Sequence, residues 1–351
     1  MLVIAFSSCK RAYENDPSKT VFRYNEASNI TSLDPAFAKD LANIWACNQL
    51  FNGLVQLSDR LEVLPCIASA WEISGDRKTY TFHLRRDVYF HDHPFFPQGK
   101  GRRINADDFI FSFNRIVDPD MTSPGSWVFN NVAYENGNYA FRSLNDSTLE
   151  IRLSAPFPPF LGILSMQYCS VVPREIIESP ESEFERNPVG TGPFRFKLWK
   201  EGIKLVFLKN ENYFEFDGER RLPHLDAVAI TFLIDKQSAF LEFVKGNLDF
   251  LSGIDMSYKD ELLTKDGNLK LKYAEMFNMI TLPYLNTEYL GILVDSSLSI
   301  VRDNPMRLKS VRQAINYGFD RSKMIRYLRN NIGYPGYYGI IPPGLRALIL
   351  H

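Results

Sequence analysis

Hydrophobic and polar positions alternate strictly in two short stretches of the chain. In residues 77–85 (RKTYTFHLR), Tyr80, Phe82 and Leu84 are separated by more polar residues. Residues 148–153 (TLEIRL) repeat the pattern. A period of two places the apolar side chains on one face of an extended strand. The pattern therefore predicts two half-buried strands.

A helical pattern lies between these two strands, in the stretch INADDFIFSFNRIVDP. Asn105 is a favourable N-cap, and Phe109, Phe113 and Ile116 recur at helical spacing. Asp118-Pro119 is expected to end the helix, because the residue before a proline avoids helical dihedral angles. We expect an amphipathic helix here with its phenylalanine face buried.

Similar segments follow along the rest of the chain. Strands are predicted at 21–24, 202–210 and 226–234, and helices at 40–52, at 236–246 and in two segments after Asn304. Strands and helices alternate without internal repeats, which favours an α/β or mixed layered protein. The length of 351 residues corresponds to about two domains.

The composition excludes some classes of protein and leaves the use of the aromatic residues open. The chain is 45% hydrophobic and 23% charged, with a net charge of −1, as in ordinary globular proteins. Without a basic excess, a nucleic-acid partner is not expected. Aromatic residues reach 14%, which suits either a large core or an apolar pocket.

A glycine-rich stretch, NPVGTGPFRFKLWKEG at 187–202, has the look of a phosphate-binding loop. It lacks the Gly-Lys-Ser/Thr ending, and Pro193 removes one backbone N–H that such a loop would use. A strand pattern follows, not the start of a helix. Gly190 and Gly192 instead predict a close crossing of two chain segments.

His91 and His93 form the single histidine cluster of the chain. Their spacing on an extended segment would place both rings on one face, where a third ligand could complete a metal site. No distant partner is evident, and Pro94 follows directly, so a surface turn is expected. Motifs of nucleophilic, metal or nucleotide catalysis are lacking. The sequence therefore predicts no enzyme, no cofactor and no metal.

The first residues resemble the end of a lipoprotein signal. A short apolar run, Leu2–Phe6, precedes small serines and Cys9, which would carry the lipid. Residues 1–20 are then a signal remnant and tether; the alternative is a chance cysteine at a frayed terminus. Cys47, Cys66 and Cys169 match no zinc spacing and are expected to be buried small hydrophobic residues.

Several segments together resemble a known family, in the same order along the chain. The segments are SLDPAFAKDLANIWACNQLFNGLVQLS, LPCIASAWEISGDRKTYTFHLRRDVYFHD, INADDFIFSFNRIVDP, NPVGTGPFRFKLWKEGIKLVFLKNENYF and KSVRQAINYGFDRSKMI. They are similar to blocks of the peptide-binding branch of extracytoplasmic solute-binding proteins, which serve ABC importers. The resemblance runs from about residue 21 to 343 and is lost after Pro343.

The resemblance implies an α/β protein with mixed sheets and a two-lobe fold like that of periplasmic binding proteins. Lobe I would comprise residues 21–284, with a subdomain at roughly 65–185. Residues 285–351 would begin a lobe II that is truncated and only partly present. The acidic residue with which the family pairs the amino terminus of a peptide would lie in the missing part.

The family implies a function without catalysis. The two lobes close on an extended peptide and deliver it to the membrane permease of an ABC transporter. The protein would be a monomer in the periplasm or at the cell surface, anchored to the membrane by lipid. Alternatives are a same-fold binding protein for nickel, haem or a sugar, and a surface interaction protein without a transport role.

The resemblance also points to ligand-binding residues. The backbone of Asn29, Ile30, Thr31, Ser32 and Leu33 is expected to form a strand beside the ligand. Further candidates are Phe51, Asn52 and Gly53 as a wall of lobe I, Trp127 as a pocket aromatic, and Thr191 as a contact. The alternative for each is an ordinary core or turn residue.

Overall fold

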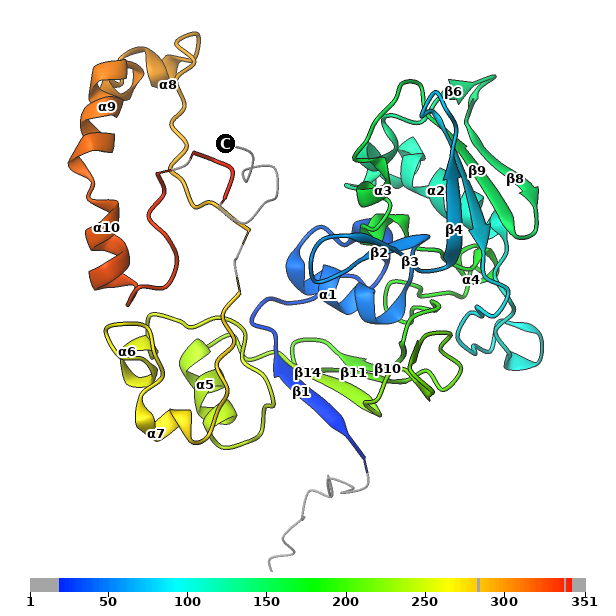
Figure 1. Cartoon of the computed structure of the whole chain (residues 1–351), viewed down its shortest axis with the longest axis horizontal. Coiled ribbons are helices and arrows are strands. Elements are labelled where there is room, and N and C mark those ends of the chain that lie inside the picture. Colours follow the sequence, from blue (N-terminus) through cyan, green and yellow to red (C-terminus); the bar gives the residue numbers. More distant parts are fainter. Residues whose placement is uncertain (1–18, 283–284, 338, 343–351) are drawn as a thin grey trace, which may run out of the picture. The chain divides into compact units, whose positions relative to one another are not determined.

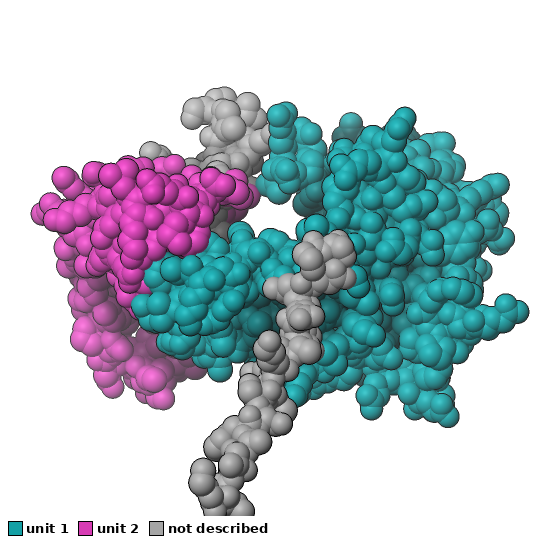
Figure 2. Space-filling view, turned by 90° about the horizontal axis from the view of Figure 1, so that it is seen from below, with its two compact units in different colours: residues 1–251 teal, residues 252–351 magenta. Residues whose placement is uncertain are grey.

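The computed structural model describes residues 19–282, 285–337 and 339–342. The chain divides into two compact units, Met1–Leu251 (unit 1) and Ser252–His351 (unit 2), which Figure 2 shows in different colours. Each unit is described by itself below. The lobe boundaries expected from the family, at residues 284 and 285, stay a prediction.

A mixed four-stranded sheet joins the beginning of unit 1 to its end. Its strands are β1 (Val21–Asn25), β14 (Ala227–Thr231), β11 (Lys204–Lys209) and β10 (Phe194–Lys200), in that order (Figure 1). β1 is parallel to β14, and the other neighbours are antiparallel. β14 (AVAIT) is central and buried over four of its five residues, as expected for a strand of β-branched and small apolar residues.

A second, antiparallel sheet contains the two strands with strict alternation. Its order is β4 (Ala68–Ile73), β5 (Thr79–Leu84), β9 (Thr148–Arg152) and β8 (Phe141–Asn145). Phe82 of β5 lies opposite Leu149 of β9, and both side chains are fully buried. The alternating patterns of 77–85 and 148–153 are therefore confirmed as strands with one buried face.

Helix α2 (Ala106–Val117) contacts β8 and β9 of this sheet. It begins with a capping box, in which the side chain of Asn105 accepts from the N–H of Asp108 while the Asp108 carboxylate accepts from the N–H of Asn105. Phe109 and Phe113 are completely buried, and the ring centroid of Phe113 lies 4.7 Å from that of Phe129. The predicted helix and its buried face are confirmed.

Short elements complete the described part of unit 1. The other helices are α1 (Leu41–Leu50), α3 (Phe160–Ile163), α4 (Arg174–Ile177) and α5 (Lys236–Val244). Three two-stranded pairs are β2 (Val55–Leu57) with β3 (Val63–Pro65), β6 (Tyr134–Glu135) with β7 (Asn138–Tyr139), and β12 (Phe216–Asp217) with β13 (Arg220–Arg221). Single 3₁₀ turns occur at Pro35–Phe37, Pro97–Gly99, Pro119–Met121, Ser126–Phe129 and Gln167–Cys169.

The core of unit 1 absorbs much of the aromatic content. Fully buried phenylalanines include Phe82, Phe109, Phe113, Phe129, Phe160 and Phe207. Aromatic side chains of this size contribute most of the apolar area that a core removes from water. Of the two uses expected for the aromatic residues, core packing is the one that these side chains serve.

The described part of unit 2 is helical. It contains α6 (Lys259–Leu262), α7 (Leu271–Ala274), α8 (Ser299–Arg302), a 3₁₀ turn at Pro305–Arg307, α9 (Lys309–Gly318), α10 (Arg321–Lys323) and a π turn at Met324–Leu328. No strand is present among its described residues. The helices predicted after Asn304 are confirmed.

The three cysteines in the described part of the chain, Cys47, Cys66 and Cys169, are free and buried, as predicted. Burial raises the pKa of all three thiols. Cys9 lies outside the described residues. None of the described helices is long and apolar enough to cross a membrane.

Candidate functional site

The segment before α1 is fixed by a buried ion pair. Asp34 accepts a hydrogen bond from the N–H of Ala36, so it caps the 3₁₀ turn that follows. Its carboxylate also pairs with both terminal nitrogens of Arg115 from α2; the Nη1–Oδ1 distance is 2.9 Å. Both side chains are largely removed from water. The Leu-Asp-Pro motif thus ties the N-terminal segment to the helix of the second sheet.

The predicted ligand strand at Asn29–Leu33 is not a strand. The N–H of Leu33 donates to the carbonyl of Glu185 (2.9 Å), and that of Thr31 donates to the side chain of Asn43 (3.2 Å). Asn43 also donates to the hydroxyl of Thr31. The strand prediction is wrong because these partners are a helix side chain and a distant loop and do not form a ladder.

Within this segment, burial separates two groups of residues. Ile30, Ser32 and Leu33 are buried, and the carbonyl of Leu33 accepts from the thiol of Cys47. Asn29 and Thr31 are exposed. A molecule arriving from solvent can therefore contact two of the five predicted residues through their side chains.

The glycine-rich stretch crosses the end of α1 at very short range. A Cβ atom on Gly190 would lie 2.0 Å from the carbonyl oxygen of Leu50, and one on Gly192 would lie 2.4 Å from the carbonyl carbon of Leu50. The N–H of Gly192 donates to the same carbonyl oxygen at 2.8 Å. Only glycine permits this approach, so the predicted close crossing is confirmed.

His91 also contacts this crossing. Its Nε2 lies 2.9 Å from the carbonyl oxygen of Gly192, and its Nδ1 lies 3.3 Å from the nitrogen of Gly190. The N–H of His91 donates to the carbonyl of Gly190 at 2.8 Å. These contacts select the neutral tautomer with a proton on Nε2, because Nδ1 must accept. Burial lowers the pKa of His91 to about 4.

The expectation of a surface turn is therefore wrong for His91, which is 5% exposed. His93 is half-buried, and its two nitrogens face the N–H of Phe95 and the side-chain amide of Asn187. The described residues contain no group of three His, Cys, Asp or Glu side chains arranged to hold a metal ion. Both imidazoles already have polar partners for each ring nitrogen.

A chain of side-chain hydrogen bonds extends from the crossing. Thr191 donates to Oδ1 of Asn52 (3.1 Å), and Nδ2 of Asn52 donates to the hydroxyl of Tyr213 (3.2 Å). That hydroxyl donates to Oε2 of Glu215 (3.1 Å), whose other oxygen accepts from Gln56 (2.8 Å). Burial raises the pKa of Tyr213, so its phenol keeps the proton that it donates.

The hydrogen bond from Thr191 to Asn52 brings Thr191 next to the segment Phe51–Gly53. Phe51 is buried, with its ring centroid 6.0 Å from that of Phe184, and Thr191 is 1% exposed. Asn52 and Gly53 are half-buried. Solvent therefore reaches Asn52 and Gly53, whereas Phe51 and Thr191 are enclosed by the protein.

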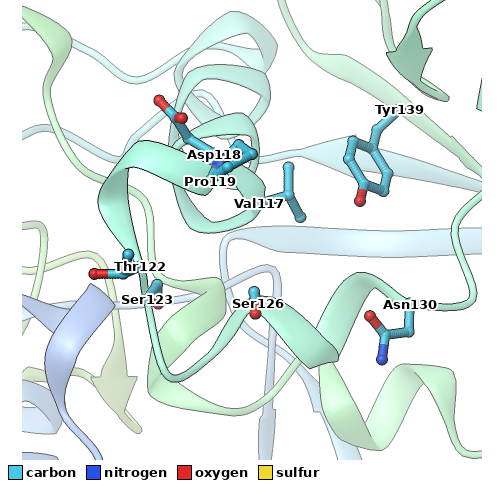
Figure 3. A pocket seen from close by; sticks show the side chains of 8 residues that line it. All are labelled: Val117, Asp118, Pro119, Thr122, Ser123, Ser126, Asn130 and Tyr139. Atoms are coloured by element: carbon cyan, nitrogen blue, oxygen red, sulfur yellow. The ribbon is translucent and has the colours of Figure 1, made fainter.

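Trp127 belongs to a different part of unit 1. It lies in the Ser126–Phe129 turn and is 45% exposed. Its neighbour Ser126 lines an open hollow of about 340 Å³, together with Val117, Asp118, Pro119, Thr122, Ser123, Asn130 and Tyr139 (Figure 3). Trp127 is not among the lining side chains, so its role as a pocket aromatic gains no support from this hollow.

Four residues of the hydrogen-bond chain and of the crossing were not predicted from the sequence. These are Gln56, Tyr213 and Glu215 in the network and His91 at the crossing. The stretch 211–217 is rich in carboxylate and amide side chains, yet Tyr213 is buried and Glu215 half-buried. The one available signal was the aromatic run within ENYFEF, since aromatic side chains are uncommon in solvated loops.

Comparison with known proteins identifies relatives along most of the chain. The chain is 28% identical over 306 residues to the dipeptide-binding protein of Escherichia coli K12, covering 84% of this chain and 52% of that protein. It is 28% identical over 330 residues to haem-binding protein A of Haemophilus influenzae, covering 90% of this chain and 56% of that protein. The chain spans about half the length of these curated relatives.

Solved structures give the same fold. The Escherichia coli murein tripeptide-binding protein matches with a TM-score of 0.73 and 22% identity, over 93% of this chain and 60% of that one. A Helicobacter pylori periplasmic binding protein in complex with the peptide STSA matches with a TM-score of 0.69 and 25% identity, over 92% and 63%. The chain thus has the two-lobe fold of periplasmic binding proteins, with the second lobe only partly represented.

Residues 62–347, most of the chain, match the family described as bacterial extracellular solute-binding proteins, family 5 middle. The aligned relatives are binding proteins. The chain therefore belongs to family 5 of the bacterial extracellular solute-binding proteins.

Proposed function

We propose that the protein binds peptides outside the cytoplasm and delivers them to the permease of an ABC transporter. The observation that carries this proposal is the similarity to a dipeptide-binding protein over 84% of the chain. The fold match to a binding protein whose structure was solved in complex with the peptide STSA supports it. Family 5 membership alone is compatible with several kinds of solute.

The proposed ligand surface in unit 1 consists of the accessible members of the predicted set. Asn29, Thr31 and Asn52 offer exposed or half-buried polar side chains, and Gly53 offers backbone. Extended peptides bind such surfaces through main-chain hydrogen bonds, which tolerate different side chains. Closure of lobe I (21–284) and lobe II (from 285) would then be driven by the ligand, as a shift between open and closed states.

We further propose that binding involves no catalytic step and that the protein acts as a monomer. Cys9 would carry the lipid that holds it at the membrane surface, in the periplasm or on the cell exterior. The permease would recognise the closed form. This role needs neither a cofactor nor a nucleic-acid partner.

A second candidate ligand is haem, because haem-binding protein A is as similar to this chain as the dipeptide-binding protein is. Another relative in fold was solved in complex with Ni(L-His). Nickel, haem and sugars therefore remain the alternative ligands, and a surface interaction role without transport the alternative function.

The test is a thermal-shift screen followed by calorimetry with peptides of two to five residues, haemin and Ni(L-His). It should be run on this chain and on a fusion that adds the portion of the Escherichia coli relative without a counterpart here. We expect peptides to stabilise the fusion and to bind the present chain only weakly, because closure needs both lobes. Stabilisation of the fusion by haemin or Ni(L-His) but by no peptide would refute the peptide assignment.

A further inference from the structure

Four segments of unit 1 meet at the turn Gly190–Gly192: the turn itself and the segments of Leu50, His91 and Asn210. Gly192 O lies near Nε2 of His91 (2.9 Å) and accepts from Nδ2 of Asn210 (3.0 Å). Gly190 O accepts from the N–H of His91, and the N–H of Gly192 donates to Leu50 at the end of α1. The turn 190–192 is therefore held from three directions by groups that are distant in sequence.

The same turn holds the accessible part of the lobe I wall. Thr191, between the two glycines, donates to the side chain of Asn52, and Leu50 immediately precedes Phe51 and Asn52. A displacement of the turn must therefore move Asn52 or break its hydrogen bond. In the described part of the chain, His91 forms hydrogen bonds with Gly190 and Gly192 but not with Asn52, so it acts on Asn52 through the turn.

We propose that His91 is a positioning residue for the lobe I wall, which its neutral ring orders through the Gly190–Gly192 turn and which loosens when the ring is protonated. A protonated ring has a proton on both nitrogens, so Nδ1 would face the N–H of Gly190 donor to donor. That a ligand contacts Asn52 and Gly53 rests on the proposed function; that His91 orders them does not.

The groups around the ring of His91 determine the pH at which it is protonated. The charged groups that act on it are Arg195 of β10, which opposes protonation, and Asp92, which favours it. Asp92 is itself paired with Lys100 at 2.7 Å. The glycine turn that the ring contacts, and Asn210, which shares the carbonyl of Gly192 with it, are uncharged. Burial is the largest influence and also opposes protonation, which places the transition below neutral pH.

The experiment is amide hydrogen exchange with mass spectrometry on segments 48–54 and 188–194, expressed as protection relative to the unstructured rate at each pH. Substitution His91→Ala should lower protection in both segments about tenfold at pH 7, because each lost hydrogen bond weakens the local structure. Substitution His91→Gln keeps a donor for Gly192 without a titrating ring. It should retain most protection at pH 7.

Lowering the pH to 4, near the pKa of His91, then distinguishes a titrating, positioning ring from one that only fills space. The wild type should lose protection in both segments, whereas His91→Gln should not. His83→Gln is the matched control, because His83 is a solvent-accessible histidine of β5 beside Glu72, and it should behave as wild type. A parallel loss in wild type and His91→Gln would overturn the proposal, as would unchanged protection of 48–54 in His91→Ala.

If His91→Ala fails to fold, the pH comparison of wild type with His91→Gln decides alone. A peptide found by the screen above adds a second measurement, in which the affinity of wild type should fall between pH 7 and 4 and that of His91→Gln should not. If no peptide binds, the proposed function fails, while hydrogen exchange still tests His91.

Discussion

In unit 1 the large apolar side chains are buried in one continuous cluster, whereas in the described part of unit 2 many of them face solvent. Phe82, Phe113 and Phe207 are completely buried in unit 1. In unit 2, Leu290 is 91% exposed and Ile280 79% exposed. The two units also differ in strand pairing: the sheets lie in unit 1, and the described residues of unit 2 form no strand.

Helix α9 and the segment 285–294 show what this difference means. α9 has Val311 and Ile315 four residues apart, an apolar pair at helical spacing, yet none of its residues is buried. Residues 289–294 (YLGILV) are apolar and exposed and belong to no strand. Local patterns thus suffice to form a helix, but the burial of its apolar face depends on segments packed against it. Unit 1 supplies those segments itself.

The largest expected effect is a core truncation in unit 1. Phe113→Ala removes a fully buried ring that contacts Phe109, Phe129 and Phe141. We expect a loss of about 3–5 kcal/mol in the free energy of unfolding, because a cavity is left behind. Urea unfolding followed by tryptophan fluorescence measures it, since all four tryptophans lie in unit 1. A loss below about 1 kcal/mol would mean that this core is not tightly packed.

Breaking the buried ion pair should cost nearly as much. Asp34→Ala leaves Arg115, which is 11% exposed at its side chain, without its carboxylate. Removing one partner of a buried pair costs about 3–5 kcal/mol, because the remaining charge stays unpaired. The control is Glu178→Ala, which breaks the exposed pair with Arg174 and should cost less than about 0.5 kcal/mol. Equal losses in the two variants would contradict the buried pairing.

Acidification should weaken unit 1 through His91. Its pKa is about 4 in the folded protein, below the ordinary value of 6.5, so the unfolded state binds more protons between these two pH values. The contribution is complete above pH 6.5 and is lost as the pH falls toward 4, by up to about 3 kcal/mol. Urea midpoints of wild type and His91→Gln across pH 4–8 measure it; identical pH slopes would contradict it.

A methyl group at the crossing should have a smaller effect. Gly192→Ala places a Cβ 2.4 Å from the backbone carbon of Leu50, which forces the turn and the end of α1 apart. We expect a loss of about 1–3 kcal/mol, the usual cost of overpacking. Gly162→Ala in α3 is the matched control, because its Cβ would meet no atom within 4 Å. The crossing is looser than described if both variants are equally stable.

The smallest expected change in stability comes from a substitution in unit 2, and it tests the contrast between the two units directly. Leu290→Ala removes an apolar side chain of unit 2 that is 91% exposed. We expect a change within about 0.5 kcal/mol, as for other surface substitutions. Circular dichroism of the helical signal during urea unfolding measures it. A cost as large as that of Phe113→Ala would show that Leu290 is buried in solution, and the contrast between the units would fail.

Local patterns predicted the elements of unit 1 well. The alternation in 77–85, the capping residues of α2 and the glycines of 187–202 each reflect a physical requirement that a few neighbouring residues express. The face of α1 was less predictable. Leu41 and Trp45 have the spacing of a buried stripe but are about half exposed, and Ala42, Ala46 and Cys47 are buried instead. Apolar residues of α1 point to all sides of the helix, so its sequence does not select one buried face.

The candidate site was predicted only in part, because its contacts join distant residues. His91 bonds to glycines about 100 positions away, and Asn52 bonds to Tyr213 across 161 positions. The partners of His91 are backbone atoms, which any residue supplies and no sequence pattern reveals. The family resemblance pointed to Phe51–Gly53 and Thr191 as separate candidates; the structure joins them through the hydrogen bond of Thr191 to Asn52, and burial decides which of them solvent can reach.

The pairing of β1 with β14 sets an order of events during synthesis. Val21 lies opposite Ala227, so β1 has no sheet partner until more than 200 further residues have been made. At about 5–20 residues per second, this strand waits for roughly 10–40 seconds. β10 and β11, by contrast, are separated by a three-residue connection and can pair at once. The sheet is therefore expected to assemble from its late strands first, with the earliest strand of the chain added last.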